Sequence, residues 1–230
     1  KTKVLIDSCS FLYDNGFITG LLVICPNGVK GTWVKEIETH MPDHVDRNVI
    51  VWTGQKTKKH EEELQTLFSV DSVHFNILIM NVDAFTTDRG KKFADKFLMT
   101  RQAVLSVDES TVIKNSTALR TKAITKLGNL ARYRVIMTGS PITKSPEDLY
   151  AQCNFLNHEL LGFSSIYTFR ARYCQMQRLS FGGRSFNKVT GFKNLEELNT
   201  KLQKFSYRVL KKDALDLPDQ VWVKRLVSMT

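Results

Sequence analysis

The amino-acid sequence predicts an α/β fold in which a parallel sheet carries helices on both faces. Five short apolar runs start 27, 28, 27 and 30 residues apart, and helical patterns fill the intervals between them. Such an interval accommodates a strand, a crossover helix and the start of a parallel neighbour. After residue 156 this rhythm stops, and a basic, aromatic segment follows, which we expect to form a helical insertion.

The expected strands are rich in aliphatic and β-branched residues, as strands buried on both faces are. They cover residues 21–25, 48–52, 76–80, 103–107 and 133–137. Helical patterns cover residues 4–13, 29–39, 58–68, 93–98 and 117–127, and a further pattern covers residues 195–205. The predicted order therefore alternates helix and strand through residue 137.

Composition and length narrow the class of protein. With 230 residues, 42% of them hydrophobic and 24% charged, the chain has an ordinary globular composition and enough length for one sizeable core. No apolar run approaches the ~18–20 residues that cross a bilayer, so we expect no membrane partner. The four cysteines are scattered without metal-ligand spacing, which favours reduced core thiols and an intracellular location.

The charge balance points to a polyanionic partner. Lysine and arginine number 33 against 23 acidic residues, a surplus that most often serves nucleic acid. The surplus is concentrated in residues 160–194, which contain no Asp or Glu. Candidate DNA-binding cations there are Arg170, Arg172, Arg178, Arg184 and Lys188. The aromatic residues between them either stack on bases or pack the insertion's own core.

Asp108-Glu109 directly follows the fourth apolar run. Parallel α/β sheets bind ligands at the carboxyl ends of their strands. A buried strand followed by Asp-Glu is the pattern in which phosphate-loop ATPases hold Mg²⁺ with the Asp and activate water with the Glu. Two solvated acids at a strand end are the alternative interpretation of this dipeptide alone.

Lys1-Thr2 strengthens the ATPase interpretation. The pair directly precedes an apolar helical pattern, as the last two residues of G-x-x-x-x-G-K-[ST] do. In that loop the Lys reaches the β- and γ-phosphates of ATP, and the Thr hydroxyl binds Mg²⁺. The glycines of the pattern would precede Lys1. Together the two dipeptides predict an ATP- and Mg²⁺-binding site.

Two further strand ends carry candidate functional residues. Thr138, Gly139 and Ser140 follow the fifth run, where a turn can relay a change at the γ-phosphate to other parts of the protein. Pro26 and Asn27 follow the first run and precede a helix, where backbone amides can hold a phosphate of a nucleic-acid strand. A plain turn and a plain helix start are the alternatives.

The order of these motifs resembles one family. The stretches are LLVICPNGVKGTWVKEIETHMP, VLSVDESTVIKN, ARYRVIMTGSPITKSPEDLYAQCNFL and FSYRVLKKDALDLPDQ. They resemble the first, RecA-like motor lobe of Swi/Snf-type ATPases of helicase superfamily two, over nearly the whole chain. The compactness of the sequence suggests a bacterial or phage-like member.

The resemblance implies a role for each motif. Lys1 and Thr2 would end motif I, and Asp108 and Glu109 would form the core of motif II. Thr138, Gly139 and Ser140 would belong to motif III, while Pro26, Asn27 and Asn81 would match motifs that contact one DNA strand. The family hydrolyses ATP to move along duplex DNA, and its second RecA-like lobe supplies arginine fingers, so this lobe alone is expected to be weak or inactive.

The same resemblance implies a domain organisation. Residues 1–157 would form the ATP-binding helicase lobe, residues 158–212 a helical protrusion and return, and residues 213–230 the start of a linker to the second lobe. Ser110-Thr111 stands where the family usually has Ala-His, and Ser140 stands where Thr is usual. Two alternatives are a terminase-like DNA-packaging ATPase and a DNA-binding module whose motor residues are vestigial.

Overall fold

A computed structural model describes residues 1–69, 74–181, 184–210, 214, 216 and 223–225. The chain divides into two units, Lys1–Asn194 and Leu195–Thr230, which are described separately. The first unit contains the sheet and every candidate site residue, whereas helix α8 (Leu195–Gln203) belongs to the second. The expected linker at 213–230 falls mostly outside the described residues.

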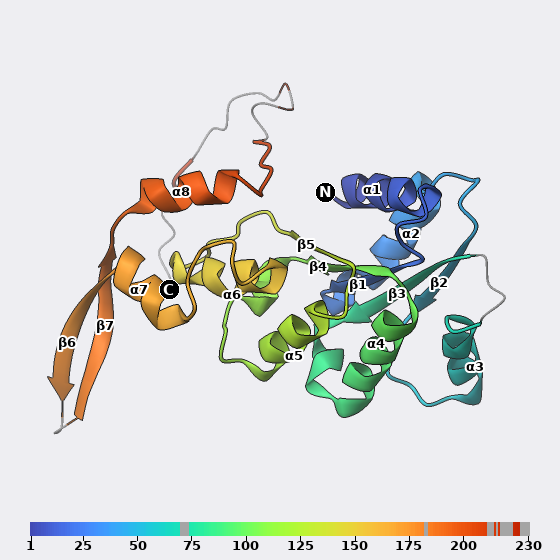
Figure 1. Cartoon of the computed structure of the whole chain (residues 1–230), viewed down its shortest axis with the longest axis horizontal. Helices are drawn as coiled ribbons and strands as arrows, with labels where there is room; N and C mark the ends of the chain where they lie inside the picture. Colours follow the sequence, from blue (N-terminus) through green and yellow to red (C-terminus); the bar gives the residue numbers. More distant parts are fainter. Residues whose placement is uncertain (70–73, 182–183, 211–213, 215, 217–222, 226–230) are drawn as a thin grey trace. The chain divides into compact units, whose positions relative to one another are not determined.

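A five-stranded parallel sheet with the order β2-β3-β1-β4-β5 organises the first unit (Figure 1). The strands are β1 (Gly20–Cys25), β2 (Arg47–Val51), β3 (Phe75–Asn81), β4 (Ala103–Asp108) and β5 (Tyr133–Met137). All five predicted strands are confirmed. β1 is buried throughout, as its uninterrupted apolar run requires.

Helices cover both faces of the sheet, as predicted, because successive strand side chains point to opposite faces. α1 (Thr2–Asp14) and α2 (Lys30–His40) share one hydrophobic cluster with the strand residues Leu21, Val23 and Ile77. α3 (Lys58–Thr66), α4 (Asp88–Thr100), α5 (Leu119–Gly128) and α6 (Glu147–Leu156) contribute to the opposite cluster with Leu22 and Leu78.

Short polar caps and one close packing contact fix where helices begin. The Thr87 side chain accepts a hydrogen bond from the Gly90 amide and so caps α4. Gly90 also lies against the 3₁₀ turn Val82–Thr86, where an added Cβ would stand 2.2 Å from the Ala84 carbonyl oxygen. Only glycine permits this approach, which places α4 under the sheet. Among the described helices, none is long and apolar enough to cross a membrane.

The expected helical protrusion is corrected by the structure. In the described part of the segment, α7 (Ile166–Tyr173) and α8 are helical, whereas β6 (Cys174–Phe181) and β7 (Arg184–Phe192) form an antiparallel two-stranded ribbon. Leu179 faces Phe186 across the ribbon, and Gly191 allows the Gln175 side chain to lie over it. Cross-strand pairs of this kind stabilise a ribbon that has no helical face to bury. The expectation of a helical protrusion over residues 158–212 is therefore wrong for residues 174–181 and 184–192, which are strands.

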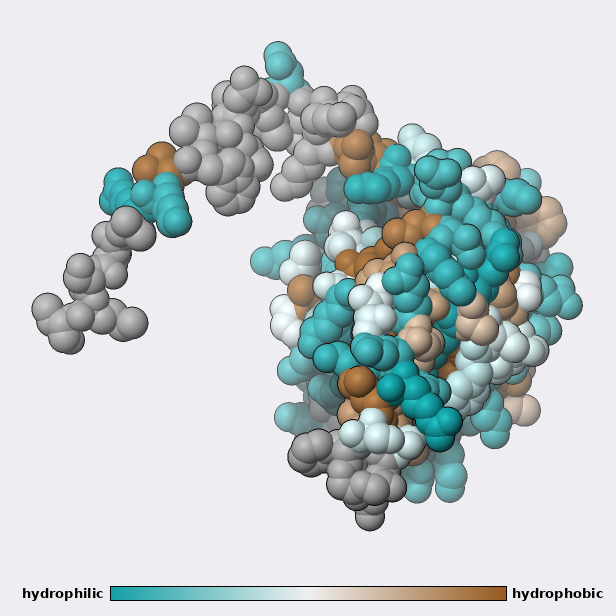
Figure 2. All heavy atoms as spheres, turned by 90° about the vertical axis from the view of Figure 1, so that its left-hand side faces the viewer, coloured by the Kyte–Doolittle hydropathy of each residue, from teal (hydrophilic) through white to brown (hydrophobic). Residues whose placement is uncertain are grey.

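The aromatic residues of this segment divide into two groups. Phe163, Phe169 and Tyr173 contact one another, with ring centroids 4.9–5.6 Å apart, and Phe169 also lies 5.7 Å from Tyr150 of α6. These rings form a small core that joins α7 to the lobe. Phe186 on the ribbon is 53% exposed instead. Figure 2 views the molecule from the ribbon's side, where hydrophilic residues dominate and apolar ones are scattered.

Candidate functional site

The carboxyl ends of four strands meet at one edge of the sheet. Cys25 pairs in register with Asn81, Ile24 with Val107, and Asp108 with Met137. The residues that follow these strands therefore lie along the same edge, where parallel α/β sheets bind ligands. The structure confirms that the motif residues predicted at strand ends share this edge.

Glu109 is the centre of this edge. Lys1 Nζ lies 2.8 Å from Glu109 Oε1, and the Thr138 hydroxyl donates to Glu109 Oε2 at 3.4 Å. Residues from the start of α1, the end of β4 and the end of β5 thus meet at one carboxylate. The Lys1 and Glu109 side chains are 46% and 45% exposed. Such an exposed pair is worth little energy, so a ligand can exchange for either partner.

The Glu109 backbone is held in the left-handed region, with φ 49° and ψ 59°. This conformation costs a residue with a Cβ roughly 1–2 kcal/mol. It turns the chain sharply at the end of β4, before the 3₁₀ turn Ser110–Ile113. Backbone strain of this kind concentrates at functional sites. Glutamate rarely adopts the left-handed conformation, so the sequence does not predict it here.

The Asp108 carboxylate is fixed by two donors. Trp33 Nε1 of α2 donates to Asp108 Oδ2 at 3.0 Å, and the Glu109 amide donates to Oδ1 at 3.0 Å. The Trp33 ring is 2% exposed, so its position is set by the core. The sequence predicts a helix over residues 29–39, which contains Trp33, but not this contact, which spans 75 residues of chain.

The start of α1 supplies the cationic side of the edge. Lys1 is the N-cap residue, no side chain caps the helix, and its first turn holds no acidic residue. Free amides at a helix N-terminus attract anions such as phosphate. Thr2 is partly exposed in this first turn. Lys1 and Thr2 therefore lie where the sequence predicts a phosphate-binding segment.

The turn after β5 is tied to the same carboxylate. Thr138 Oγ1, which donates to Glu109, also accepts a hydrogen bond from the Ser140 amide at 3.2 Å. The Ser140 hydroxyl donates to the Ile142 carbonyl at 2.9 Å. A movement of Glu109 would therefore shift the hydrogen bonds of this turn, which the sequence predicts as a coupling segment.

A buried polar network beneath the edge was missed by sequence reasoning. The Ser110 hydroxyl donates to Gln152 Oε1 of α6 at 2.6 Å. Gln152 Nε2 donates to the Pro141 and Asp148 carbonyl oxygens, each at 2.7 Å. The network joins the turn after β4 to the turn after β5. A glutamine in the otherwise apolar face of a helix is the sequence signal that could have found it.

Asp148 stabilises the turn after β5 from below. Burial alone would raise the pKa of its carboxyl. Hydrogen bonds from the Thr143 hydroxyl and from the Lys144 and Thr143 amides, with the nearby Lys114 charge, outweigh burial and lower that pKa. Lys114 Nζ also donates to the Thr143 hydroxyl. Together with the Gln152 bond to Pro141, these bonds anchor the turn to α6.

The predicted DNA-binding residues fall into two places. Pro26, Asn27 and Asn81 lie at the carboxyl edge, where Pro26 precedes the 3₁₀ turn Asn27–Val29 and Asn81 ends β3. The basic residues lie in the insertion, and their exposure differs. Arg170 forms an ion pair with Glu147 of α6, so it also anchors α7.

Three of the other cations of the insertion are exposed to solvent. Arg172 is exposed at the end of α7, and Arg178 and Lys188 are exposed on the ribbon. The backbone of Arg184 begins β7, and its side chain lies outside the described part of the structure. The structure thus separates the ribbon's cations from the edge residues.

The donor set at the edge fits Mg²⁺ only together with a ligand. Among the described residues, no group of three or more His, Cys, Asp and Glu side chains could hold a metal. Mg²⁺ prefers oxygen ligands and usually takes one or two from protein, with substrate phosphates and water completing its shell. The Asp108 carboxylate and the Thr2 hydroxyl are oxygen donors of this kind.

The four cysteines are free and buried, and burial raises the pKa of the Cys9, Cys25 and Cys153 thiols to about 12.

Comparison with known proteins places this edge in a family context. The chain is 28% identical over 202 residues to a SWI/SNF-related matrix-associated actin-dependent regulator of chromatin subfamily A-like protein 1 homolog from Caenorhabditis elegans, covering 87% of this chain and 26% of that protein. It is 26% identical over 206 residues to the DNA annealing helicase and endonuclease ZRANB3 of Mus musculus, covering 87% of this chain and 18% of that protein. The chain thus spans about a quarter or less of these relatives.

Solved structures and a family profile agree with these relatives. The Sulfolobus solfataricus SWI2/SNF2 ATPase core in complex with dsDNA has the same fold, with a TM-score of 0.56 and 24% identity over 75% of this chain and 32% of that chain. The profile of the SNF2-related domain matches residues 1–230. The chain therefore belongs to the SNF2-related domain family.

Proposed function

We propose that this chain is the first nucleotide-binding lobe of an ATP-dependent, helicase-like DNA motor that moves along or remodels duplex DNA. The observation that carries the proposal is the Glu109 carboxylate, held between Lys1 and Thr138 at the carboxyl edge of the sheet. A base, a phosphate-binding cation and a responsive hydroxyl are the groups that phosphoryl transfer to water needs in one place.

Glu109 would act as the general base toward the attacking water. In this structure its negative charge is neutralised by Lys1 at 2.8 Å. The γ-phosphate of ATP carries more negative charge than a carboxylate, so it would draw Lys1 away from Glu109. The same exchange frees the Glu109 carboxylate to accept a proton. ATP binding and activation of the base are thereby linked through one lysine.

Asp108 and Thr2 are the residues that would hold Mg²⁺. When bound there, the ion would neutralise charge that develops on the phosphate oxygens. The Trp33 and Glu109 donors keep the Asp108 carboxylate in one orientation before ligands arrive. Preorganised groups of this kind need no rearrangement during reaction.

Thr138 and Ser140 would relay the state of the nucleotide. Thr138 senses the position of Glu109 through its hydroxyl, and the Ser140 amide is bound to the same hydroxyl. The Ser110–Gln152 bond gives the turn a second link to the end of β4. We infer that this turn couples hydrolysis to a second RecA-like lobe, which would supply the arginine fingers.

Two surfaces support DNA as the partner. Pro26, Asn27 and Asn81 line the edge where the lobe would face one strand. The ribbon adds Arg178 and Lys188 as exposed cations in a stretch that contains no acidic residue. The printed name of the mouse relative describes a DNA annealing helicase, and the Sulfolobus core was solved with dsDNA.

Four buried thiols support an intracellular location. Membership in a bacterial or phage-like branch stays a prediction.

The decisive experiment replaces Glu109 with Gln in the protein that carries both lobes. Loss of the base should lower DNA-stimulated kcat for ATP by roughly 10²–10⁴-fold, while ATP binding is retained. Glu38→Gln, at an exposed position on the outer side of α2, is the matched control and should leave kcat unchanged. Unaltered turnover in Glu109→Gln would exclude Glu109 as the base.

The same two-lobed protein distinguishes the motor from one alternative function, a DNA-binding module. The usual Ala-His after Asp-Glu is replaced by Ser110-Thr111, and Ser110 is buried in a bond to Gln152. A DNA-binding module with vestigial motor residues predicts duplex binding that does not respond to ATP and Mg²⁺. Titrating duplex DNA with and without ATP–Mg²⁺ distinguishes this module from the motor.

A further inference from the structure

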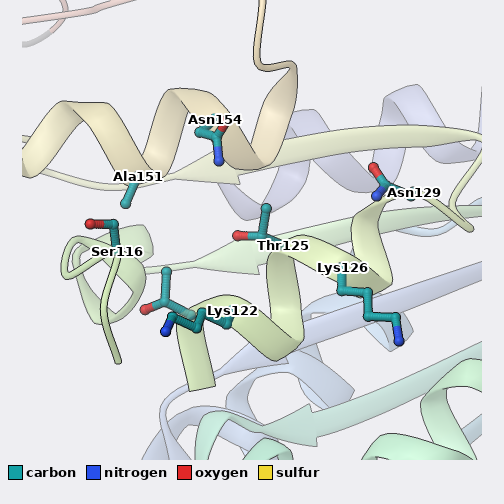
Figure 3. Close-up of a pocket in the computed structure, with 8 residues that line it drawn as sticks. Ser116, Lys122, Thr125, Lys126, Asn129, Ala151 and Asn154 are labelled. Atoms are coloured by element: carbon teal, nitrogen blue, oxygen red, sulfur yellow. The ribbon is translucent and has the colours of Figure 1, made fainter. Parts of the chain in front are cut away.

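A polar groove of about 310 Å³ lies between α5 and α6 (Figure 3). The residues of α5 and its ends contribute most of the lining, and α6 contributes the rest. The lining residues are Ser116, Thr121, Lys122, Thr125, Lys126, Asn129, Ala151 and Asn154. In Figure 3, Thr125 and Asn154 point toward each other across the groove, and Lys126 extends outward from α5.

The groove lining contains polar and cationic side chains but no acidic ones. Seven of the eight residues are polar, two are lysines, and none is acidic. Lys122, Thr125, Lys126 and Asn129 are spaced three or four apart, so they occupy one side of α5. In the described part of the chain, neither Lys122 nor Lys126 forms an ion pair. The groove therefore offers hydrogen-bond donors and positive charge without an internal counter-charge.

Thr121 adds an independent observation. Its side chain is 2% exposed, and its Oγ1 has no hydrogen-bond partner among the described residues. A buried hydroxyl without a partner is unfavourable in a folded protein, and such groups are few. Because Thr121 belongs to the groove lining, an acceptor oxygen of a ligand bound in the groove would satisfy its hydroxyl.

We propose that this groove binds phosphate groups. Lysine, threonine, serine and asparagine are among the side chains that hold phosphate oxygens of nucleic acids. A peptide groove would need apolar pockets for anchoring side chains, and Ala151 is the one apolar residue in this lining. The phosphates come either from the backbone of a nucleic acid or from a free nucleotide or polyphosphate, and both display the same oxygens.

The groove is formed by residues other than those of the ATP edge, so it is a second phosphate site. The expectation that a nucleic-acid backbone fills it rests on the proposed DNA motor, whereas the phosphate chemistry does not. A nucleic-acid backbone bound between α5 and α6 would give the lobe a DNA contact that does not depend on whether ATP is bound. The tests below measure binding without ATP hydrolysis, so their outcome is independent of the Glu109→Gln experiment.

The first test is the salt dependence of duplex binding by the full chain. Lys122→Gln/Lys126→Gln is compared with Lys35→Gln/Lys92→Gln, which removes the same charge from exposed positions on α2 and α4. Each lost phosphate contact lowers the slope of log K against log salt by about 1, so the groove pair should lower it by about 2. The control pair should leave the slope nearly unchanged. Circular dichroism confirms that both variants fold.

The second test uses inorganic tripolyphosphate and the variant Thr121→Val. Valine keeps the shape of threonine without the hydroxyl, so the free protein should melt at the same or a higher temperature. Its affinity for tripolyphosphate, measured by calorimetry, should nevertheless fall several-fold. Weakened tripolyphosphate binding with unchanged duplex binding assigns the groove to free phosphates. If neither ligand loses affinity in either groove variant, or if polyglutamate binds as tightly as tripolyphosphate, the proposal is overturned.

Discussion

The carboxyl edge of the sheet and the β6–β7 ribbon both carry charged residues that the sequence marks as functional, but they hold them differently. At the edge, Glu109 contacts two side chains from distant parts of the chain, and the Asp108 carboxylate accepts two hydrogen bonds. On the ribbon, Arg178 and Lys188 project from opposite strands and are exposed. The edge holds its charged side chains through hydrogen bonds, whereas the ribbon exposes its charged side chains to solvent.

The difference follows from what each region would do. Proton transfer and phosphate chemistry need groups placed to within a fraction of an ångström, so strain and buried donors are worth their cost. Attraction to a DNA backbone needs charge near the surface, and its precise position matters little. Substitutions at the edge should therefore change rates and stability, whereas those on the ribbon should change the salt dependence of binding.

After Glu109→Gln, the largest effect at the edge is expected from Trp33→Phe, which keeps an aromatic ring but removes the donor to Asp108. Trp33 is a positioning residue, and loss of such a partner typically costs about 10–100-fold in activity. We expect kcat for ATP to fall by this factor while the apparent affinity for duplex DNA is unchanged. Trp52→Phe, at another buried tryptophan, is the control and should lower stability without changing kcat. Equal kcat in Trp33→Phe and wild type would contradict the role.

A stability measurement sharpens the same comparison. Ser110→Ala leaves the buried Gln152 Oε1 without its donor, which should cost about 1–3 kcal/mol in the free energy of unfolding. Ser185→Ala removes the exposed hydrogen bond to Ser180 on the ribbon, at 2.9 Å, and should change that energy by less than about 0.5 kcal/mol. Urea unfolding of both variants compares them directly. Equal losses would show that the edge is no more constrained than the ribbon.

The smallest effect on the fold is expected from Arg178→Gln/Lys188→Gln. Both side chains are exposed, so the melting temperature should not change. If they contact phosphates, the slope of log K against log salt for duplex binding should fall by about 2. Fluorescence anisotropy over a salt series provides the measurement. A slope equal to that of wild type would limit the ribbon to packing against α7.

The strands and the edge could be predicted because both depend on patterns that one sequence contains. Each buried strand is an apolar run, and the run spacing with helical patterns between the runs fits parallel crossovers. Once the sheet is parallel, the ends of β1, β3, β4 and β5 must share an edge. Asp108, Glu109 and Thr138 were therefore predicted together without knowledge of any distance.

The remaining features depend on contacts that sequence patterns do not encode. The ribbon is exposed on both faces, so residues 174–192 lack a clean alternation of apolar and polar positions. The glycine pair at residues 182 and 183 is a hairpin signal that could have corrected the helical prediction. The bonds from Trp33 to Asp108 and from Ser110 to Gln152 join residues far apart in the chain. Apart from the glutamine in the apolar face of α6, no local sequence pattern indicates these two bonds.

The left-handed backbone at Glu109 has a consequence for protein engineering. A glycine at this position would adopt the same dihedral angles without penalty, and so would favour the folded state. Selection of this chain for heat resistance alone would therefore tend to erase the carboxylate at the centre of the edge. Stabilised versions of the lobe are best sought in the two hydrophobic clusters, with residues 108–110 held constant during library design.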